Sequence, residues 1–332
     1  MPNNEMNRPI ETEGKKSLVE LATENPIQLI EKDHKWTADE LKEMFPGKNI
    51  FACDLYLKGI ESSERFGNYF RDENVVNIDH HSNLSEMERE VSATNLAIDY
   101  VNEFGPVTEG DDNIVVISHT DCDSILSSLI MRGILPPDTK FGEAAIAADH
   151  TGEENEIADL LQALQEENKT GDLEFSLRNL QKFLDGEQLE DKAVEYINSR
   201  KAKREKVRQL VESGSFKNKD GVNYTRLESK IDSELLPAYL PEAEIILLYS
   251  PHKNNPDPEN ITLWEAKTRL GMAAPEGLSL KRIMAKDDKN PAGVDPAWGG
   301  RWNAGSDARE GGTTMDMEEY VSLVAQKLAE TK

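Results

Sequence analysis

The chain has 332 residues, of which 37% are hydrophobic and 30% charged, and its formal net charge is −25. This composition indicates a folded globular protein, and the length predicts two domains rather than one. The acidic excess argues against binding to long duplex DNA, because non-specific affinity for DNA comes mainly from lysine and arginine contacts to phosphates. A small anionic substrate stays open, since metal ions and a few arginines can reverse the potential inside a cleft.

The sequence predicts a cytoplasmic protein without membrane contact. No apolar run approaches the roughly 20 residues that span a bilayer. The first 20 residues are polar and lack the apolar core of a signal peptide. The cysteines, Cys53 and Cys122, are too few for a disulfide framework, which favours a reducing compartment. A homodimer stays open at this stage.

A polar arm over residues 1–33, with helical spacing around residues 18–22, comes first in the chain. The capping box Thr37–Glu40 predicts a short helix that ends near Phe45. Four short apolar runs follow, and we expect a strand for each: residues 49–54, 75–79, 114–118 and 144–149.

Helical spacing predicts helices over residues 91–104 and 123–131, between these apolar runs. Buried strands that alternate with helices are typical of a parallel sheet flanked by helices, which places the chain in the α/β class. In such sheets ligands bind beyond the carboxyl ends of the strands. We therefore expect the polar residues that end the four runs to meet on one rim.

The second half predicts a helical connector and a second, smaller α/β domain. Residues 153–214 are charged and helix-prone. Strands are expected over 244–250 and 261–269, and helices over 278–285 and 317–328. The predicted division is an N-terminal arm and helix over 1–45, a first α/β domain over 46–155, a connector over 156–230 and the second domain over 231–332.

Four of the six histidines lie beside aspartates at the ends of the apolar runs. They occur in Asp79-His80-His81, in His119-Thr-Asp121-Cys-Asp123 and in Asp149-His150, while Asp54 ends the first run. Carboxylates and imidazoles together suit divalent ions, and a carboxylate shared by two ions about 3.5–4 Å apart makes a centre for phosphoryl transfer. One such aspartate alone is usually solvated or caps a helix, but the whole set predicts a dinuclear metal site.

These motifs resemble those of the DHH phosphoesterase superfamily, which includes family II inorganic pyrophosphatases, RecJ-type exonucleases, nanoRNA phosphatases and cyclic-dinucleotide phosphodiesterases. The resemblance covers about residues 48–155 and, more weakly, 240–315. The HxDxD signature is matched by His119, Asp121 and Asp123, the lone strand-end aspartate by Asp54, the DHH triplet by residues 79–81 and the fourth signature by Asp149.

The resemblance implies two divalent ions, with Mn²⁺ expected first and Mg²⁺, Co²⁺ and Zn²⁺ as alternatives. It implies one ion held by His119, Asp121 and a bridging Asp54, and another held by Asp123, Asp54, His80 and Asp149. Asp79 is then expected to orient a histidine, and His81 to face the phosphate. These two residues are the catalytic candidates.

The chain departs from the family's pattern in its motif order. The HxDxD motif normally comes first, whereas here it follows the DHH triplet by about 40 residues. A circularly permuted or rearranged sheet would explain this order, because parallel strands joined by crossovers can be reordered while their rim is kept. The departure puts the strand order in doubt, and the alternative is that some of the matches are accidental.

The C-terminal half resembles the DHHA1 substrate-binding domain, which has an arginine on a strand and a Gly-Gly-Gly-His loop before Ala-Gly. Arg269 and the loop over residues 298–305 take these places, but the loop is one residue short and lacks the histidine. Arg301 could replace that histidine as a phosphate clamp beside Gly299 and Gly300, because a guanidinium pairs with phosphate oxygens and glycines permit close approach.

Less specific interpretations stand beside these. Arg269 and Arg301 could equally pair with the chain's many carboxylates. His150 could be a solvated neighbour of the site, and Trp302 could stack a base. The basic run over residues 200–206 is expected to be a solvated helix face rather than a nucleic-acid patch.

The expected function is hydrolysis of a phosphodiester in a short oligonucleotide or dinucleotide by a two-metal phosphohydrolase. A family II-like pyrophosphatase or other small-substrate phosphatase is the enzymatic alternative, and it calls for a more basic C-terminal domain. A nucleotide-binding module without turnover is the non-enzymatic alternative. A missing metal ligand would favour that module, and the sequence lacks none.

Overall fold

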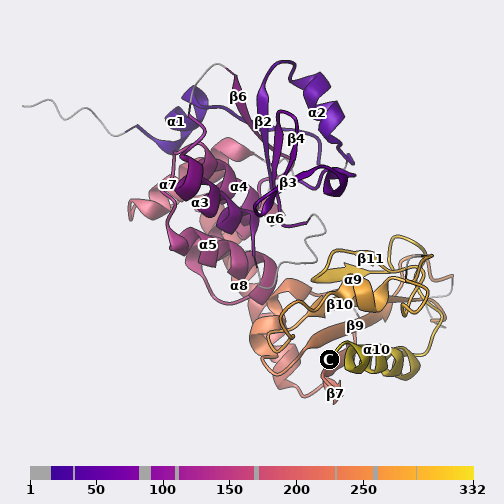
Figure 1. Ribbon diagram of the computed structural model, residues 1–332. Helices are drawn as coiled ribbons and strands as arrows, with labels where there is room; N and C mark the ends of the chain where they lie inside the picture. The colour runs from indigo at the N-terminus through magenta and orange to yellow at the C-terminus, as the bar shows by residue number, and fades with distance from the viewer. Residues whose placement is uncertain are drawn as a thin grey trace, which may run out of the picture.

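Two six-stranded sheets, each flanked by helices, make up the protein (Figure 1). The computed structural model describes residues 16–32, 34–81, 91–108, 112–167, 172–228, 230–256, 261–288 and 290–332. The predicted α/β class is confirmed. Residues 1–15 of the predicted arm lie outside the described residues. In the described part, none of the helices has the length and apolar character to cross a bilayer.

The first sheet has the strand order β1-β6-β2-β5-β4-β3. Its strands are β1 (Ile27–Leu29), β2 (Asn49–Cys53), β3 (Glu64–Phe66), β4 (Tyr69–Asp72), β5 (Val75–Ile78) and β6 (Asn113–Ile117). The strands β1, β6, β2 and β5 are parallel, as predicted, and the unpredicted hairpin β3-β4 adds two antiparallel strands at one edge. The carboxyl ends of β2, β5 and β6 therefore meet on one rim.

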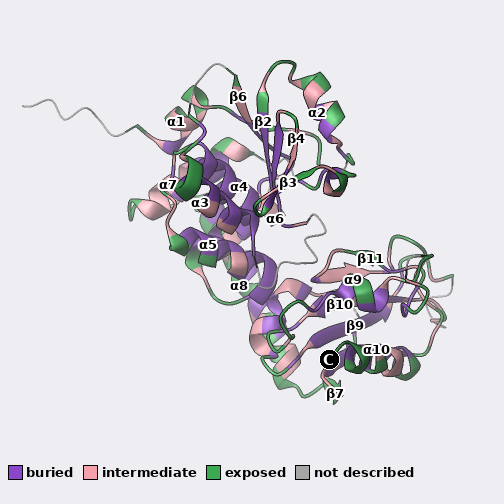
Figure 2. Ribbon diagram, in the orientation of Figure 1, coloured by how far each residue is buried: buried purple, intermediate pink, exposed green. Residues whose placement is uncertain are grey.

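Helices cover both faces of this sheet. They are α1 (Leu18–Glu24), α2 (Ala38–Met44), α3 (Ala93–Phe104), α4 (Cys122–Met131), α5 (Thr139–Ile146), α6 (Glu156–Glu167) and α7 (Leu173–Leu184), with a 3-10 turn η1 (Ile60–Ser62). Alternate residues of β2 face opposite cores, so Phe51 and Cys53 pack with α3 and α4, and Ile50 and Ala52 pack with α2. Every residue of α4 is buried (Figure 2).

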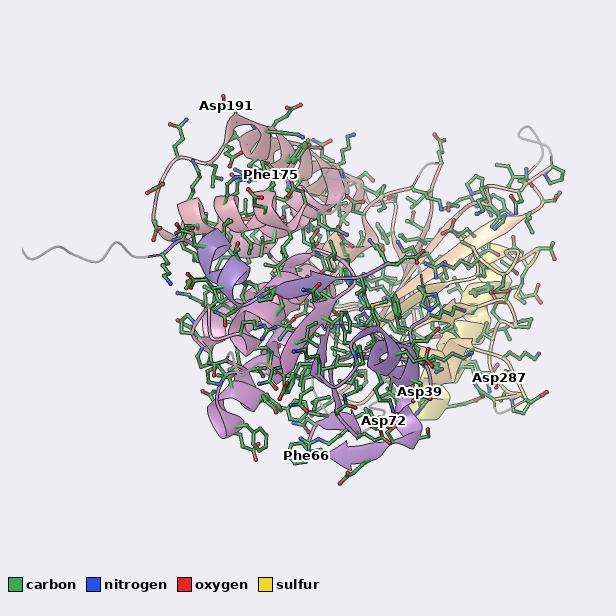
Figure 3. The ribbon with its side chains drawn as sticks, turned by 90° about the horizontal axis from the view of Figure 1, so that it is seen from above. Asp39, Phe66, Asp72, Phe175, Asp191 and Asp287 are labelled. Atoms are coloured by element: carbon green, nitrogen blue, oxygen red, sulfur yellow. The ribbon has the colours of Figure 1, made fainter. Side chains whose placement is uncertain are left out.

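Helix α2 is fixed to the sheet by an ion pair as well as by its apolar face. Lys42 lies 2.8 Å from a carboxylate oxygen of Asp39 and 3.3 Å from one of Asp72 on β4. Figure 3 shows Asp39 and Asp72 side by side at this edge of the molecule. Helix α2 is thereby held against β4.

The expected strand over residues 144–149 is wrong. These residues form the end of α5 and a π-helical turn, η2 (Ala147–Thr151). Four of the six residues are alanine, which favours helix and is depleted in strands. Asp138 caps the start of α5, and Gly152, with a positive φ of 67°, ends η2. Asp149 therefore reaches the rim from a helix and not from a strand.

The second sheet has the order β11-β12-β10-β9-β8-β7. Its strands are β7 (Lys217–Lys219), β8 (Val222–Arg226), β9 (Ile245–Pro251), β10 (Trp264–Leu270), β11 (Gly299–Gly300) and β12 (Ala304–Ser306). Only the β8-β9 pair is parallel among the described strands of this sheet. The two strands predicted from sequence are confirmed as β9 and β10, whereas the four short ones were not predicted.

Helices also lie on both faces of the second sheet. They are the 22-residue α8 (Asp191–Glu212), α9 (Leu280–Met284) and α10 (Met317–Thr331), with the 3-10 turns η3 (Ser233–Leu235) and η4 (Pro237–Tyr239). Leu247 and Tyr249 of β9 pack with α9 and α10, and Ile246 and Leu248 pack with α8 and η3. The predicted helices near the C-terminus are confirmed as α9 and α10.

The predicted domain boundaries stay predictions. Strand β1 joins the first sheet although it lies in the range predicted as an arm, and β7 and β8 join the second sheet although they lie in the range predicted as a connector. In the described part of the chain, each sheet thus includes at least one strand from outside the range predicted for its domain.

The interpretation of residues 200–206 as a solvated face is wrong for two of its arginines. Arg200 and Arg204 are buried. Both lie against the carboxylate of Asp159 on α6, at 3.1 and 2.7 Å, and Arg204 also donates to the carbonyl of Gly152 at 2.5 Å. Arg200 in addition contacts Glu234 of η3 at 3.5 Å. These arginines therefore tie α8 to the end of η2 and to the second half of the chain.

We expect Gly152→Ala to destabilise the protein more than Gly186→Ala. Both glycines have positive φ, 67° and 71°, so each alanine has the same backbone cost of about 1–2 kcal/mol. A Cβ at Gly152 would lie 2.3 Å from the carbonyl oxygen of Glu234, whereas one at Gly186 meets nothing within 4 Å. Urea unfolding should show a further loss of about 1–3 kcal/mol for Gly152→Ala. Equal losses in the two variants would contradict close packing of η2 on η3.

Candidate metal centre

Asp54 lies at the centre of the candidate site, directly after β2. Its backbone is left-handed, with φ of 47°, and its side chain is 2% exposed. The hydroxyl of Ser124 donates to Oδ2 at 2.7 Å, but Oδ1 has no hydrogen-bond partner among the described residues. A buried carboxylate oxygen without a donor is costly, and a bound cation would satisfy it.

His119 and Asp121, which follow β6, lie on one side of Asp54. The Nε2 atom of His119 is 2.8 Å from Oδ2 of Asp121 and 3.2 Å from Oδ2 of Asp54. Asp121 is held in place because its Oδ1 accepts the backbone N–H of Ser124 and caps α4. These three side chains form one group that could hold a metal ion.

His80, which follows β5, lies on the other side of Asp54. It is 1% exposed, and neither ring nitrogen has a hydrogen-bond partner in the described part of the chain. Its Nε2 atom is 3.6 Å from carboxylate oxygens of Asp54 and Asp123 and 3.3 Å from Oδ2 of Asp149. His80, Asp123 and Asp149 form a second group that could hold an ion. Asp54, His80, Asp123 and Asp149, which come from four separate segments, are thus brought together despite the rearranged motif order.

Asp123 is held by the start of α3. Its two carboxylate oxygens accept the backbone N–H groups of Ala93 and Thr94 at 2.8 and 2.7 Å, and the Thr94 hydroxyl at 2.6 Å. Burial and the neighbouring Asp54 raise the pKa of Asp123 to about 7. A carboxylate has about four lone-pair directions. The capping bonds therefore fix this side chain while leaving room for a cation.

Asp79 and His81 connect the cluster to the second half of the protein. Oδ1 of Asp79 lies 2.6 Å from Nδ1 of His81, which assigns the ring proton to Nδ1 and leaves Nε2 as an acceptor. Nε2 contacts the guanidinium of Arg301, and another nitrogen of Arg301 lies 3.4 Å from Oδ2 of Asp149. The sequence expectation that Asp79 orients a histidine has a geometric counterpart in this pair.

Arg269 on β10 is also at the site. It is buried and donates to the backbone carbonyl of Asp149 at 2.8 Å. Burial lowers the pKa of Arg269. Both arginines singled out from sequence therefore contact Asp149: Arg301 contacts its carboxylate and Arg269 its backbone carbonyl. Arg301 thus pairs with a protein carboxylate and also lies at the site.

Gly299 and Gly300 form β11, which pairs with β12 beside this cluster. A Cβ at Gly300 would lie 2.4 Å from the carbonyl oxygen of Ala304, so the tight hairpin requires glycine there. A cavity of about 740 Å³ opens next to the hairpin. It is lined by His81, Arg301, Trp302, Tyr56, Lys35, Lys267, Lys281, Arg309, Glu61, Glu310, the two glycines and residues 304–306.

His150 is not a solvated neighbour, and that interpretation is wrong. It is 5% exposed, lies 3.1 Å from the side-chain nitrogen of Asn303 and stacks on Trp302 with ring centres 5.4 Å apart. Burial lowers its pKa well below the ordinary value, so the ring is neutral at pH 7. One side of the Trp302 indole is therefore packed against the chain itself.

The candidate ligands fit divalent ions. Nitrogen and oxygen atoms bound to one ion at about 2.0–2.2 Å lie roughly 3–3.5 Å apart. The His119 and His80 contacts span 2.8 to 3.6 Å, and Asp54 belongs to both the group around His119 and a group with His80 and His81. The orphaned atoms Asp54 Oδ1 and His80 Nε2 are the ones a cation would satisfy. These observations support one ion bound to Asp54, or two ions that share Asp54 as a ligand.

The electrostatics of the ion-free cluster favour protonated histidines. Burial by itself lowers the pKa of His80 and His119, but the surrounding carboxylates outweigh burial and hold each pKa well above its ordinary value. Burial raises the pKa of Asp54, but the two histidines bring it well below its ordinary value. These raised pKa values favour the charged form of both imidazoles when no ion is bound.

Several residues of the site had no assigned part in the sequence analysis. Ser124 supports Asp54, Thr94 supports Asp123, and Asn303 contacts His150. Ser124 lies one residue after the HxDxD motif, so spacing could have suggested it. Asn303 lies in the loop over residues 298–305 that the sequence analysis singled out, whereas Thr94 comes from a segment without a motif.

No family model matches the chain, and no curated protein matches it. Among solved structures, it is similar to a chain described as "pGpG-specific phosphodiesterase - PggH from Vibrio cholrae". The two chains share 10% identity and have a TM-score of 0.42, over 71% of this chain and 96% of the other. Similarity at this level transfers neither substrate nor activity to this protein.

We expect Mn²⁺ binding to release protons and to weaken as the pH falls. The raised pKa values of His80 and His119 keep both rings protonated without metal, and an ion binds only to neutral imidazole. Calorimetric titration in two buffers of different ionisation enthalpy should give heats that differ by about one to two protons per chain. Asp39→Asn, at an exposed carboxylate on α2, should leave the heats unchanged. Identical heats in both buffers would contradict this charge state.

Proposed function

We propose that this protein is a two-metal phosphohydrolase that cleaves a phosphodiester bond in a short oligonucleotide or a dinucleotide. The observation that carries the proposal is that six candidate ligands lie in neighbouring groups linked by the buried residues Asp54 and His80. They are Asp54, His80, His119, Asp121, Asp123 and Asp149. The DHH-like motifs in the sequence support the same chemistry, and Mn²⁺ is the ion we expect first.

Two divalent ions, when bound, would activate the attacking water and neutralise charge on the phosphate oxygens. In hydrolysis the water oxygen forms a bond to phosphorus, the bond to the leaving ester oxygen breaks, and that oxygen takes up the proton that water gives up. His81 can carry this proton once Arg301 turns from Nε2 to a phosphate oxygen, because the Asp79 contact leaves Nε2 as an acceptor. Arg301, next to Nε2, is placed to hold a phosphate oxygen.

A pyrophosphatase is the second candidate, and one observation favours it. Lys267, Lys281 and Arg309 from the C-terminal half line the cavity together with Arg301, which is the basic lining that a pyrophosphatase needs. The cavity volume of about 740 Å³ and the aromatic rings of Tyr56 and Trp302 favour a larger substrate that carries bases. We therefore rank the phosphodiesterase first.

Asp54→Asn should abolish hydrolysis. The substitution removes one negative charge from a residue that belongs to two of the three candidate ligand groups, and we expect kcat to fall by at least about 10³-fold. Release of mononucleotides from a labelled dinucleotide, and of phosphate from pyrophosphate, with Mn²⁺ present, distinguishes the two candidates. Asp39→Asn serves as the matched control at an exposed aspartate. No hydrolysis of any phosphoester by protein with two bound metals would refute an enzyme.

Arg301→Gln should lower kcat/KM by about 10²–10³-fold, because the phosphate loses a charged donor. Arg301→Lys should recover only part of this loss, since lysine cannot hold two oxygens in the fork geometry of a guanidinium. Steady-state kinetics, with metal content measured for each variant, separates lost substrate binding from lost metal. Arg208→Gln, at an exposed arginine on α8, is the control. Unchanged kcat/KM in Arg301→Gln would remove Arg301 from the site.

A further inference from the structure

A second cavity is lined by residues of α6, α8 and η4 and by the last turn of α7. Its volume is about 620 Å³, within the range of small-molecule sites. Of the described residues that line it, none is a candidate metal ligand. The cavity is therefore separate from the candidate metal centre.

Four apolar side chains form one continuous part of its wall. Leu160 of α6 is buried, and Phe183, Leu189 and Ile197 are partly buried and pack against the cluster to which Leu160 belongs. All four line the cavity. An apolar group that covers this surface would remove it from water, which is favourable.

Helix α8 leads from this apolar surface to cationic side chains. Ile197, Lys201 and Arg204 are spaced by four and three residues and share one face of the helix. An α-helix rises 1.5 Å per residue, so Ile197 and Arg204 lie about 10 Å apart along α8. The cavity thus has an apolar end and a cationic end about 10 Å apart.

The cationic end has hydrogen-bond donors to spare. Arg204 is 7% exposed, and its terminal nitrogens bond the carbonyl of Gly152 at 2.5 Å and Asp159 at 2.7 Å. Its Nε–H has no hydrogen-bond partner in the described part of the chain. Lys201 is exposed and forms no ion pair with any described residue. A buried donor of this kind calls for an acceptor, and two neighbouring cations favour an anionic one.

The charge of the wall limits the ligand to a single negative charge. Four carboxylates also line the cavity, those of Glu154, Glu156, Asp159 and Glu205. Two of them are held by arginines, Asp159 by Arg204 at 2.7 Å and Glu205 by Arg208 at 2.8 Å. The others add negative charge, which disfavours nucleotides and other multiply charged anions. A carboxylate with an uncharged apolar body fits this balance.

We propose that this cavity binds a monocarboxylate with an unbranched apolar chain. The carboxylate accepts from Arg204 and Lys201, and the chain lies on the apolar wall formed with Ile197. An extended chain advances about 1.3 Å per bond, so a separation of about 10 Å corresponds to about eight carbons.

The same arginine connects this cavity to the candidate metal centre. Arg204 bonds the carbonyl of Gly152, which ends η2, and η2 carries Asp149. A ligand that restrains Arg204 therefore orders the end of η2. The carboxylate acts in this way as an effector, and neither its binding nor this ordering depends on the proposed hydrolysis.

Calorimetric titration of the full-length protein with octanoate tests the site. We expect a Kd of about 0.1 mM or tighter, and binding at least about tenfold weaker for acetate, 1-octanol and octylamine. Acetate lacks the chain, octanol lacks the charge and octylamine reverses it. Equal binding of octanol would show that the cations play no part, and tighter binding of octylamine would show that the carboxylates of the wall dominate. Either result would overturn the proposal.

Two variants locate the bound carboxylate. Lys201→Gln should raise the Kd for octanoate by about fivefold, and Leu189→Trp, which fills the apolar end, by about tenfold or more. Lys206→Gln is the control, because Lys206 is exposed on the opposite face of α8. Urea unfolding checks that each variant stays folded. An unchanged Kd in both variants would place the ligand elsewhere and refute the site.

Hydrogen exchange tests the effect on η2 without metal or substrate. Octanoate should slow amide exchange in residues 147–153 by at least about threefold in the wild type and leave it unchanged in Leu189→Trp. Exchange in this segment that does not respond to bound octanoate would refute the effector role. Because these measurements need no turnover, their outcome is independent of whether the protein hydrolyses a phosphodiester.

Discussion

The whole site depends on one electrostatic constraint, the burial of several carboxylates around His80. Moving a carboxylate out of water costs several kcal/mol unless positive groups and hydrogen-bond donors surround it. The chain meets this cost with backbone N–H groups at the start of α3 for Asp123, and with Arg301 for Asp149. Asp54 and His80 still keep orphaned atoms. A divalent cation would satisfy both atoms, and charge compensation and the proposed activity would then have the same origin.

The same constraint couples the two halves of the chain. The segment from Asp149 to Gly152 is held from both sides: Arg269 and Arg301 of the second half contact Asp149, Trp302 stacks on His150, and Arg204 of α8 bonds Gly152. The candidate metal ligand Asp149 and the cavity-lining residues Arg301 and Trp302 are therefore positioned by one set of contacts. In the proposed function, a substrate bound beside His81 would meet the candidate metal ligands and Arg301 together, an arrangement that orients the reacting bond.

Sequence patterns predicted what depends on continuous apolar runs and on motif spacing. Strands β2, β5, β6 and β9 were found because they are short, mostly apolar runs whose residues are largely buried, and β10 was found next to β9 although charged residues interrupt its apolar ones. The pairs β3-β4, β7-β8 and β11-β12 were missed because they are short and rich in polar residues or glycine. The candidate ligands were recognisable by residue type. Lys35 and Arg309 were not recognisable, because the sequence does not show that these exposed cations line the cavity.

The unusual motif order and the helical origin of Asp149 have one physical explanation. A rim made of parallel strand ends is defined by where the strands lie in the sheet, and β6, β2 and β5 present Asp121, Asp54 and His80 side by side whatever their order in the chain. The fourth contributor needs only to end at the same place. The alanine-rich run from Ala144 ends there as a helix, fixed by Gly152 and Arg204. The candidate site therefore depends on where the ligand atoms meet and not on whether a strand or a helix carries them.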